Sequence, residues 1–320
     1  MKIVLISEKL GEPDDEGIAA ITGKFFSRLK KENETIAIKP VYDCSAARAD
    51  TSAGIVAAKA NRYFFGFDII RMIRAFSPEM IVYLPWTSAT LRSLLRLKAI
   101  SLLSGGKAET GIMIFQPEEY NFLEKILIRF LKPDYIYSIS AKSLELFGKM
   151  GIRGELYVPE IDRDRFRRVD RDEALKLFPE LAGKKAALHV GHINRFRIDQ
   201  DLVRRIAEAG FTPVIVGSPS TPQDSGLIEE LLYFGAVVYI ERIENLAALY
   251  SLADFYFFPV TNERSSVAIP LSVLEALACG TRVITTRFGS LPDILKDDPM
   301  VTFIDRPEEI PKIIVANLSL

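Results

Sequence analysis

The chain has 320 residues, which at roughly 150 residues per domain predicts about two domains. With 48% apolar and 26% charged residues the composition is globular, which excludes a disordered tail and a collagen-like chain. The formal net charge of −1 argues against a dedicated nucleic-acid binder, because such a protein needs a strongly basic domain.

Cysteine use and hydropathy point to a cytoplasmic protein. Cys44 and Cys279 are far apart and fit no metal or redox spacing, so we expect two free thiols in a reducing compartment. The apolar run after Lys2 stops at Glu8, too soon for a signal peptide, and no run approaches the ~18 apolar residues of a transmembrane helix. Peripheral attachment at the inner face of a membrane stays open as an alternative.

In the first half, short apolar runs alternate with helical patterns. Apolar strands separated by helices are typical of a parallel sheet covered on both faces. The predicted strands are 2–7, 35–41, 80–84, 111–115 and 135–139, and the predicted helices are 18–29, 65–76, 90–103, 118–131 and 142–150.

The alternation stops between Val158 and Lys185, where dense mixed charge and two prolines indicate a domain junction. It then resumes with strands at 186–191, 212–217, 236–240, 255–259, 282–286 and 301–305, and helices at 201–209, 227–234, 246–252 and 272–278, before a short last helix. We therefore predict two doubly wound, Rossmann-like α/β domains, residues 1–160 and 161–320.

Ligands of an open parallel sheet bind beyond the carboxyl ends of its strands, so the loops there are candidate sites. The most informative segment is 263–293. Pro270 suits the first turn of a helix, whose free N–H groups and dipole attract a phosphate. Glu275, about one turn further, is placed to accept hydrogen bonds from sugar hydroxyls. The alternative for Glu275 is a surface or capping carboxylate.

The segment LSVLEALACGTRVITTRFGSLPDIL at 271–295 resembles the donor site of family 4 glycosyltransferases, two-domain GT-B enzymes that use nucleotide-activated sugars. The stretches VPEIDRDRF, HVGHINRFRIDQDLV, TPVIVGSP and ENLAALYSLADFYFFPV are similar to other parts of that family. The resemblance covers about residues 155–305, and extends to the first half only in the order of its strands.

This resemblance implies sugar transfer with retention from a nucleotide-sugar, without a metal cofactor, to an unknown glycan or lipid-linked acceptor held by the first domain. It assigns the diphosphate to Arg197 and the ribose hydroxyls to Glu275. The implied donor-binding residues are Gly17, His192, Arg195, Arg197, Pro270, Leu271, Glu275, Gly289, Ser290 and Leu291, and the implied catalytic residues are Arg197 and Glu263.

Several positions depart from the family pattern. Val267 stands eight residues before Glu275, where the family has its first glutamate, and Glu263 is the nearest replacement. His192 stands at an arginine position, with Arg195 available to compensate. The chain also stops after a short helix, without the family's usual carboxyl-terminal segment.

These departures motivate a second hypothesis, a catalytically silent GT-B protein that binds a sugar or nucleotide or serves as a partner subunit. A third is another α/β enzyme, such as a sugar epimerase or a nicotinamide-dependent oxidoreductase. Neither the strand at 2–7 nor that at 186–191 runs into the Gly-x-Gly-x-x-Gly loop that a dinucleotide needs.

Two further features leave alternatives open. His189 and His192 straddle a strand end, so their side chains diverge. We predict no metal site, a structural role for His189, and a phosphate contact for His192. Basic residues recur at helical spacing in the first half. Such faces suit an anionic lipid-linked acceptor or a membrane surface, but they are more typical of an ordinary solvated surface helix. These basic residues are Arg92 and Arg96 on one predicted helix, and Lys125, Arg129 and Lys132 on another.

Overall fold

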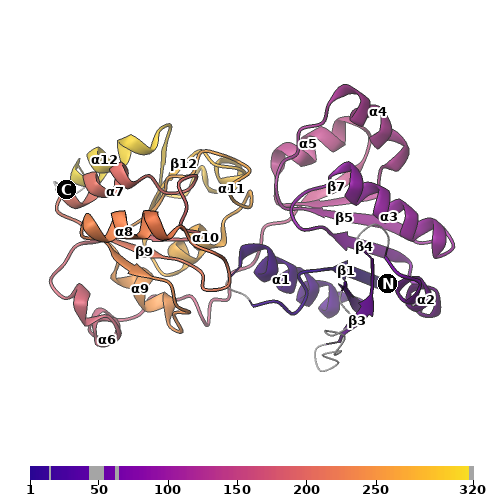
Figure 1. Ribbon diagram of the computed structural model, residues 1–320, viewed down its shortest axis with the longest axis horizontal. Coiled ribbons are helices and arrows are strands. Elements are labelled where there is room, and N and C mark those ends of the chain that lie inside the picture. Colours follow the sequence, from indigo (N-terminus) through magenta and orange to yellow (C-terminus); the bar gives the residue numbers. More distant parts are fainter. Residues whose placement is uncertain (14–15, 43–53, 62–64, 317–320) are drawn as a thin grey trace. The chain divides into compact units, whose positions relative to one another are not determined.

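The computed structural model describes residues 1–13, 16–42, 54–61 and 65–316, so Cys44 lies outside the described residues (Figure 1). The chain forms two compact units. Unit 1 comprises Met1–Pro159 together with Val267–Ile269, and unit 2 comprises Glu160–Ser266 and Pro270–Leu320. The short piece Val267–Ile269 is tied into unit 1 by a 2.9 Å hydrogen bond from the Ala268 amide to the Phe115 carbonyl.

Unit 1 is built on one parallel sheet with the strand order β3-β2-β1-β4-β5-β6-β7. Because the chain winds outward from β1 to β3 and then returns to β4, the switch point of the sheet lies between β1 and β4. The strands are β1 (Lys2–Ser7), β2 (Glu34–Val41), β3 (Ile55–Lys59), β4 (Met80–Leu84), β5 (Glu109–Ile114), β6 (Tyr135–Ser138) and β7 (Arg153–Leu156). The helices are α1 (Gly17–Glu32), α2 (Phe67–Phe76), α3 (Leu91–Leu103), α4 (Phe122–Leu131) and α5 (Ala141–Lys149).

Unit 2 repeats this plan with the order β10-β9-β8-β11-β12-β13, again all parallel, and its switch point lies between β8 and β11. The strands are β8 (Ala186–Val190), β9 (Thr212–Val216), β10 (Val237–Tyr239), β11 (Phe255–Phe258), β12 (Arg282–Thr286) and β13 (Val301–Ile304). The helices are α6 (Arg171–Leu177), α7 (Gln200–Glu208), α8 (Ser225–Tyr233), α9 (Leu246–Leu252), α10 (Leu271–Ala278), α11 (Leu291–Leu295) and α12 (Ile310–Ala316), with 3-10 turns at Pro179–Leu181 and Pro307–Glu309.

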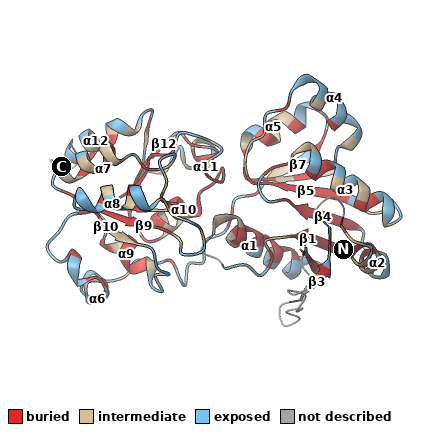
Figure 2. Cartoon of the chain, in the orientation of Figure 1, coloured by how far each residue is buried: buried red, intermediate tan, exposed pale blue. Residues whose placement is uncertain are grey.

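The central strands are buried on both faces, which explains their continuous apolar sequences (Figure 2). Every residue of β4 and of β11 is buried. The predicted fold class, two Rossmann-like doubly wound sheets, is therefore confirmed.

Local chemistry explains where element boundaries differ from the prediction. The helix predicted at 118–131 begins only at Phe122, because Asn121 and Glu124 form a capping box. The prediction missed α6, which lies within the charged junction and begins where the Asp170 side chain accepts from the amides of Asp172 and Glu173. In the described part of the chain, no helix is long and apolar enough to cross a membrane.

Candidate functional site

The loops that follow β8 and β11 meet at the switch point of unit 2. Arg197 Nε, from the loop after β8, donates a 2.6 Å hydrogen bond to the carbonyl of Ser265, from the loop after β11. The Arg197 amide also donates to the Asn194 carbonyl at 3.0 Å, which closes a turn before α7. The site thus places a guanidinium at the carboxyl edge of the two central strands.

The Arg197 side chain is partly removed from water, and burial lowers its pKa to about 10. Among the residues that the structure describes, no carboxylate forms an ion pair with Arg197. A desolvated cation without a counter-charge is costly. A bound anion would provide that counter-charge.

His189 lies at the end of β8 and is fully buried. Its Nδ1 donates to the Phe257 carbonyl at 3.0 Å, so Nε2 holds the lone pair, and Nε2 has no hydrogen-bond partner among the described residues. Burial lowers the pKa of His189 to about 4, and the nearby Arg197 charge acts in the same direction. His189 is therefore a neutral imidazole at neutral pH.

Gly191 separates these two side chains. A Cβ atom at Gly191 would lie 3.2 Å from His189 Nε2, tighter than most Cβ contacts, and 3.4 Å from Arg197 Nη1, at the near limit of ordinary contact. Because glycine has no side chain, the backbone beside the Arg197 guanidinium is uncovered. A phosphate group could therefore approach this backbone closely.

The N-terminus of α10 is tied to the end of β8. The sequence predicted Pro270 in the first turn of α10. In the structure Pro270 is the N-cap residue, one position earlier, and no side chain caps the helix. The Tyr256 hydroxyl lies 2.7 Å from Ser272 Oγ and 3.3 Å from the Val190 carbonyl, which links the first turn of α10 to β8. Leu271 is buried, so the first turn contributes backbone N–H groups rather than that side chain.

Glu275 lies one turn along α10 and is partly exposed. Its Oε2 accepts a 3.0 Å hydrogen bond from the hydroxyl of Tyr250. Tyr250 is fully buried, and burial together with the Glu275 charge raises its pKa well above the ordinary value, so the phenol remains a donor. Sequence reasoning did not foresee Tyr250, because only the fold brings α9 against α10.

The loop after β12 contains Gly289, Ser290 and Leu291. Gly289 has φ +55, a left-handed conformation that favours glycine. Ser290 and Leu291 are 1% and 0% exposed. The backbone of this loop, rather than the Leu291 side chain, is thus what it can offer to a ligand.

His192 and Arg195 are held by protein partners. His192 Nε2 donates to the Pro222 carbonyl at 2.5 Å, and Arg195 pairs with Glu230 at 2.7 Å and with Asp224 at 3.8 Å. Within the described residues, no cluster of three His, Cys, Asp or Glu side chains is placed to hold a metal ion.

Glu263 and Val267 flank the turn that Arg197 contacts. Glu263 lies two residues before Ser265, in a turn where the Ser265 amide donates to the Asn262 carbonyl at 2.9 Å. Val267 is buried in unit 1, and a Cβ at Gly17 would lie 3.8 Å from its Cγ2, an ordinary contact. Gly17 itself is the first residue of α1.

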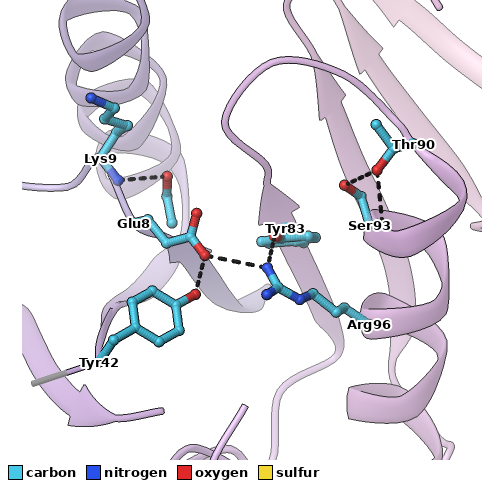
Figure 3. Close-up of polar contacts among 8 residues, drawn as sticks. Glu8, Lys9, Tyr42, Tyr83, Thr90, Ser93 and Arg96 are labelled. Atoms are coloured by element: carbon cyan, nitrogen blue, oxygen red, sulfur yellow. Dashed lines mark hydrogen bonds and ion pairs between the residues drawn. The ribbon is translucent and has the colours of Figure 1, made fainter. Parts of the chain in front are cut away.

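Unit 1 has a polar cluster at its own switch point (Figure 3). Glu8, directly after β1, accepts hydrogen bonds from the Tyr42 hydroxyl and, at 3.3 Å, from Arg96 Nη1. Arg96 Nη1 also lies 3.3 Å from the Tyr83 hydroxyl. Burial, followed by the effect of Glu8, raises the pKa of Tyr83. The expectation that Arg96 shares an outward basic face is wrong, because Glu8 and Tyr83 draw its side chain inward.

Beside this cluster, Trp86 follows β4 and is 60% exposed. The Lys9 ammonium lies 4.9 Å from the centre of the Trp86 ring and forms a 2.5 Å ion pair with Glu16. An exposed ring next to charged groups suits a hydroxylated ligand. Sequence spacing gave no signal for this cluster beyond its position at strand ends.

Part of the chain is similar in sequence to known glycosyltransferases. Residues 187–318 match the family model described as "Glycosyl transferases group 1". The D-inositol 3-phosphate glycosyltransferase of Mycobacterium ulcerans is 28% identical over 158 residues, 46% of this chain and 33% of that protein. The D-inositol 3-phosphate glycosyltransferase of Mycobacterium tuberculosis is 26% identical over 174 residues, which cover 52% of this chain and 35% of that protein. The matched part thus spans about a third of the length of these curated relatives.

Solved structures share the fold. Sucrose-phosphate synthase from Thermosynechococcus elongatus has a TM-score of 0.74 at 15% identity, covering 100% of this chain and 90% of its own. Anabaena HepE, solved with UDP and glucose, has a TM-score of 0.70 at 14% identity, covering 99% and 90%. The protein therefore has the GT-B fold of glycosyltransferases. Residues 187–318 match the glycosyl transferases group 1 model, which agrees with the resemblance noted in the sequence.

Proposed function

We propose that the protein is a glycosyltransferase that takes its sugar from a nucleotide-sugar donor bound by unit 2. The observation that carries this proposal is the desolvated Arg197 guanidinium, which lies beside the bare backbone of Gly191 and has no ion pair among the described residues. A diphosphate supplies the missing negative charge. The UDP and UDP-glucose complexes of HepE make uridine diphosphate sugars the first donors to test.

In this proposal each predicted residue has a role toward the donor. Arg197 and the N–H groups of the first turn of α10, after Pro270, hold the diphosphate, whose charge grows as the sugar leaves. Glu275, oriented by Tyr250, accepts hydrogen bonds from the ribose hydroxyls. The backbone at Gly289–Leu291 and the side chain of Glu263 face the sugar.

The remaining predicted contacts, Gly17, His192 and Arg195, serve the phosphates in this proposal. His192 and Arg195 then exchange their partners, Pro222 and Glu230, for the ligand. Transfer proceeds with retention, with the acceptor hydroxyl attacking on the face from which the phosphate departs, and it uses neither a protein nucleophile nor a metal ion.

We further propose that the acceptor binds unit 1, at the Glu8, Lys9 and Trp86 cluster. Trp86 offers a ring face to a sugar or cyclic polyol, and Glu8 can accept from its hydroxyl groups. The relatives' name describes a cyclic polyol phosphate acceptor, which makes this class a natural first test. The expected location is the cytoplasm, with peripheral attachment at the inner membrane face as the alternative.

A thermal-shift screen with UDP-, GDP- and ADP-sugars tests the donor proposal. A ligand at about 100 times its Kd stabilises the native state by about 2.7 kcal/mol, so a true donor raises the Tm measurably. Arg197→Gln should abolish the shift. Arg205→Gln, which removes an exposed arginine paired with Asp201 on α7, should preserve it. No shift with any nucleotide-sugar would contradict the proposal.

The buried Val267 favours a second candidate function, a silent GT-B protein that binds the donor without turnover. Mass-spectrometric detection of glycosylated product on a panel of polyol, glycan and lipid acceptors separates the two. Donor binding with no product on any acceptor would favour the silent protein.

A further inference from the structure

Helix α4 of unit 1 is largely exposed (Figure 2), and its exposed residues include several large apolar ones. Phe122 is 77% exposed and Phe130 is 74% exposed. Leu123, Ile126 and Leu127 are exposed as well, which makes five large apolar residues within ten positions. Single exposed apolar residues are common, but a contiguous group of this kind marks an interaction surface.

These residues share one face of the helix. At 100° per residue, positions 122, 126 and 130 lie within about 80° of each other, and 123 and 127 continue the same arc. Ile128, the one buried residue of α4, lies on the opposite side and packs into the core of unit 1. The apolar stripe, hereafter the α4 face, therefore points directly away from the core.

The α4 face is bordered by positive charge. Lys125, Arg129 and Lys132 are exposed and form no ion pair with any residue the structure describes. The only acid of α4, Glu124, is engaged by the Asn121 amide at 2.8 Å. Helix α3, which packs beside α4, adds exposed Leu95 and Lys98.

We propose that the α4 face is a docking site for an anionic lipid bilayer, in which Phe122 and Phe130 enter the interface while the flanking cations meet lipid phosphates. The combination of bulky aromatic residues with exposed cations matches the chemistry of an interfacial helix. A second copy of the chain fits less well, because a two-fold contact brings the same cations of both copies together. This proposal does not require the proposed transfer activity.

Sedimentation of the full chain with sucrose-loaded vesicles tests the proposal. The protein should bind vesicles of about three parts phosphatidylcholine to one part phosphatidylglycerol, and bind phosphatidylcholine alone far more weakly. The double variant Phe122→Ser/Phe130→Ser should bind the anionic vesicles with a partition coefficient at least about tenfold lower than that of the parent. In Lys125→Gln/Arg129→Gln the partition onto anionic vesicles should fall about fivefold per cation removed, and its salt sensitivity should fall by about half, because Lys132 and Lys98 remain.

Tyr233→Ser, at an 85% exposed aromatic residue of α8, is the matched control and should bind as the parent does. Because the replaced side chains are exposed, all variants should keep the parent Tm and near-ultraviolet circular dichroism. Should the phenylalanine variant fail to fold, the charge variant decides. Equal binding by parent and folded variants, no binding to anionic vesicles, or a dimer that Phe122→Ser/Phe130→Ser dissociates would each overturn the proposal.

Discussion

The buried phenol of Tyr250 donates a 3.0 Å hydrogen bond to Oε2 of Glu275, the carboxylate that we propose binds the donor's ribose. Tyr250 comes from α9 and Glu275 from α10, helices that pack together in unit 2. This bond fixes the orientation of the carboxylate relative to α9. Tyr250 therefore acts as a positioning residue for Glu275.

Tyr250→Phe removes that hydrogen bond and retains the ring. We expect donor KM to rise about fivefold to tenfold with little change in kcat, because ground-state and transition-state binding weaken together. Stability should fall by about 1 kcal/mol. In a Glu275→Gln background the same change should add much less, since the two residues act as a pair. Additive effects on KM would contradict the positioning role.

Arg197→Gln should lower kcat about a hundredfold to a thousandfold, as expected when a group that stabilises developing charge is removed. Because the Arg197 cation is desolvated and unpaired among described residues, the free protein should change in stability by less than about 1 kcal/mol. Arg197→Lys should recover part of the activity. Steady-state kinetics and urea unfolding measure the two quantities. A large loss of stability would indicate a structural role instead.

Gly191→Ala introduces a Cβ at 3.2 Å from His189 Nε2 and 3.4 Å from Arg197 Nη1. The His189 ring must then give by a few tenths of an ångström, and the added methyl group covers the bare backbone beside the Arg197 guanidinium, so donor affinity, measured by calorimetry, should fall about tenfold or more. Gly23→Ala is the matched control, because a Cβ in that position of α1 meets no atom within 4 Å. It should leave affinity unchanged and add about 0.5–1 kcal/mol of stability. Unchanged affinity in Gly191→Ala would remove Gly191 from the site.

His189 makes stability depend on pH. The pKa of His189 is about 4 in the folded protein, below the ordinary value of 6.5. Between pH 4 and pH 6.5 the unfolded chain therefore binds the proton more readily than the folded protein does. The contribution of neutral His189 to the free energy of unfolding is fully present above pH 6.5. It falls progressively as the pH drops toward 4, by about 3 kcal/mol in total.

Urea unfolding between pH 7 and 4 measures this effect as a difference between proteins. In His189→Asn the free energy of unfolding should fall less steeply as the pH is lowered, because the contribution of the buried imidazole is gone. In His192→Asn the free energy of unfolding should fall as it does in the parent. If His189→Asn declined as steeply as the parent, the buried imidazole would not be the group responsible.

The sequence predicted the central strands well, because β1, β4, β8 and β11 are buried on both faces and therefore read as continuous apolar runs. It missed β3 and β7, the two edge strands of unit 1, whose residues are mostly half-buried or exposed. Apolar and polar residues do not alternate along these two strands in a pattern that would identify them. The edges of the sheet were thus less visible than its centre.

The candidate site followed the same division. Glu275, Pro270 and Gly289 stand in one contiguous segment with recognisable order. By contrast, the bonds of Arg197 to Ser265 and of Tyr250 to Glu275 join residues 68 and 25 positions apart. No local pattern encodes such pairs, because only the order of the parallel strands brings these loops and helices together.

The most direct test of the donor site is a crystal structure of the protein with UDP or a UDP-sugar. We expect the diphosphate within hydrogen-bonding distance of Arg197 and of the first-turn amides of α10, with the ribose hydroxyls on Glu275. A nucleotide bound elsewhere, or a ribose that leaves Glu275 untouched, would contradict the proposed donor site.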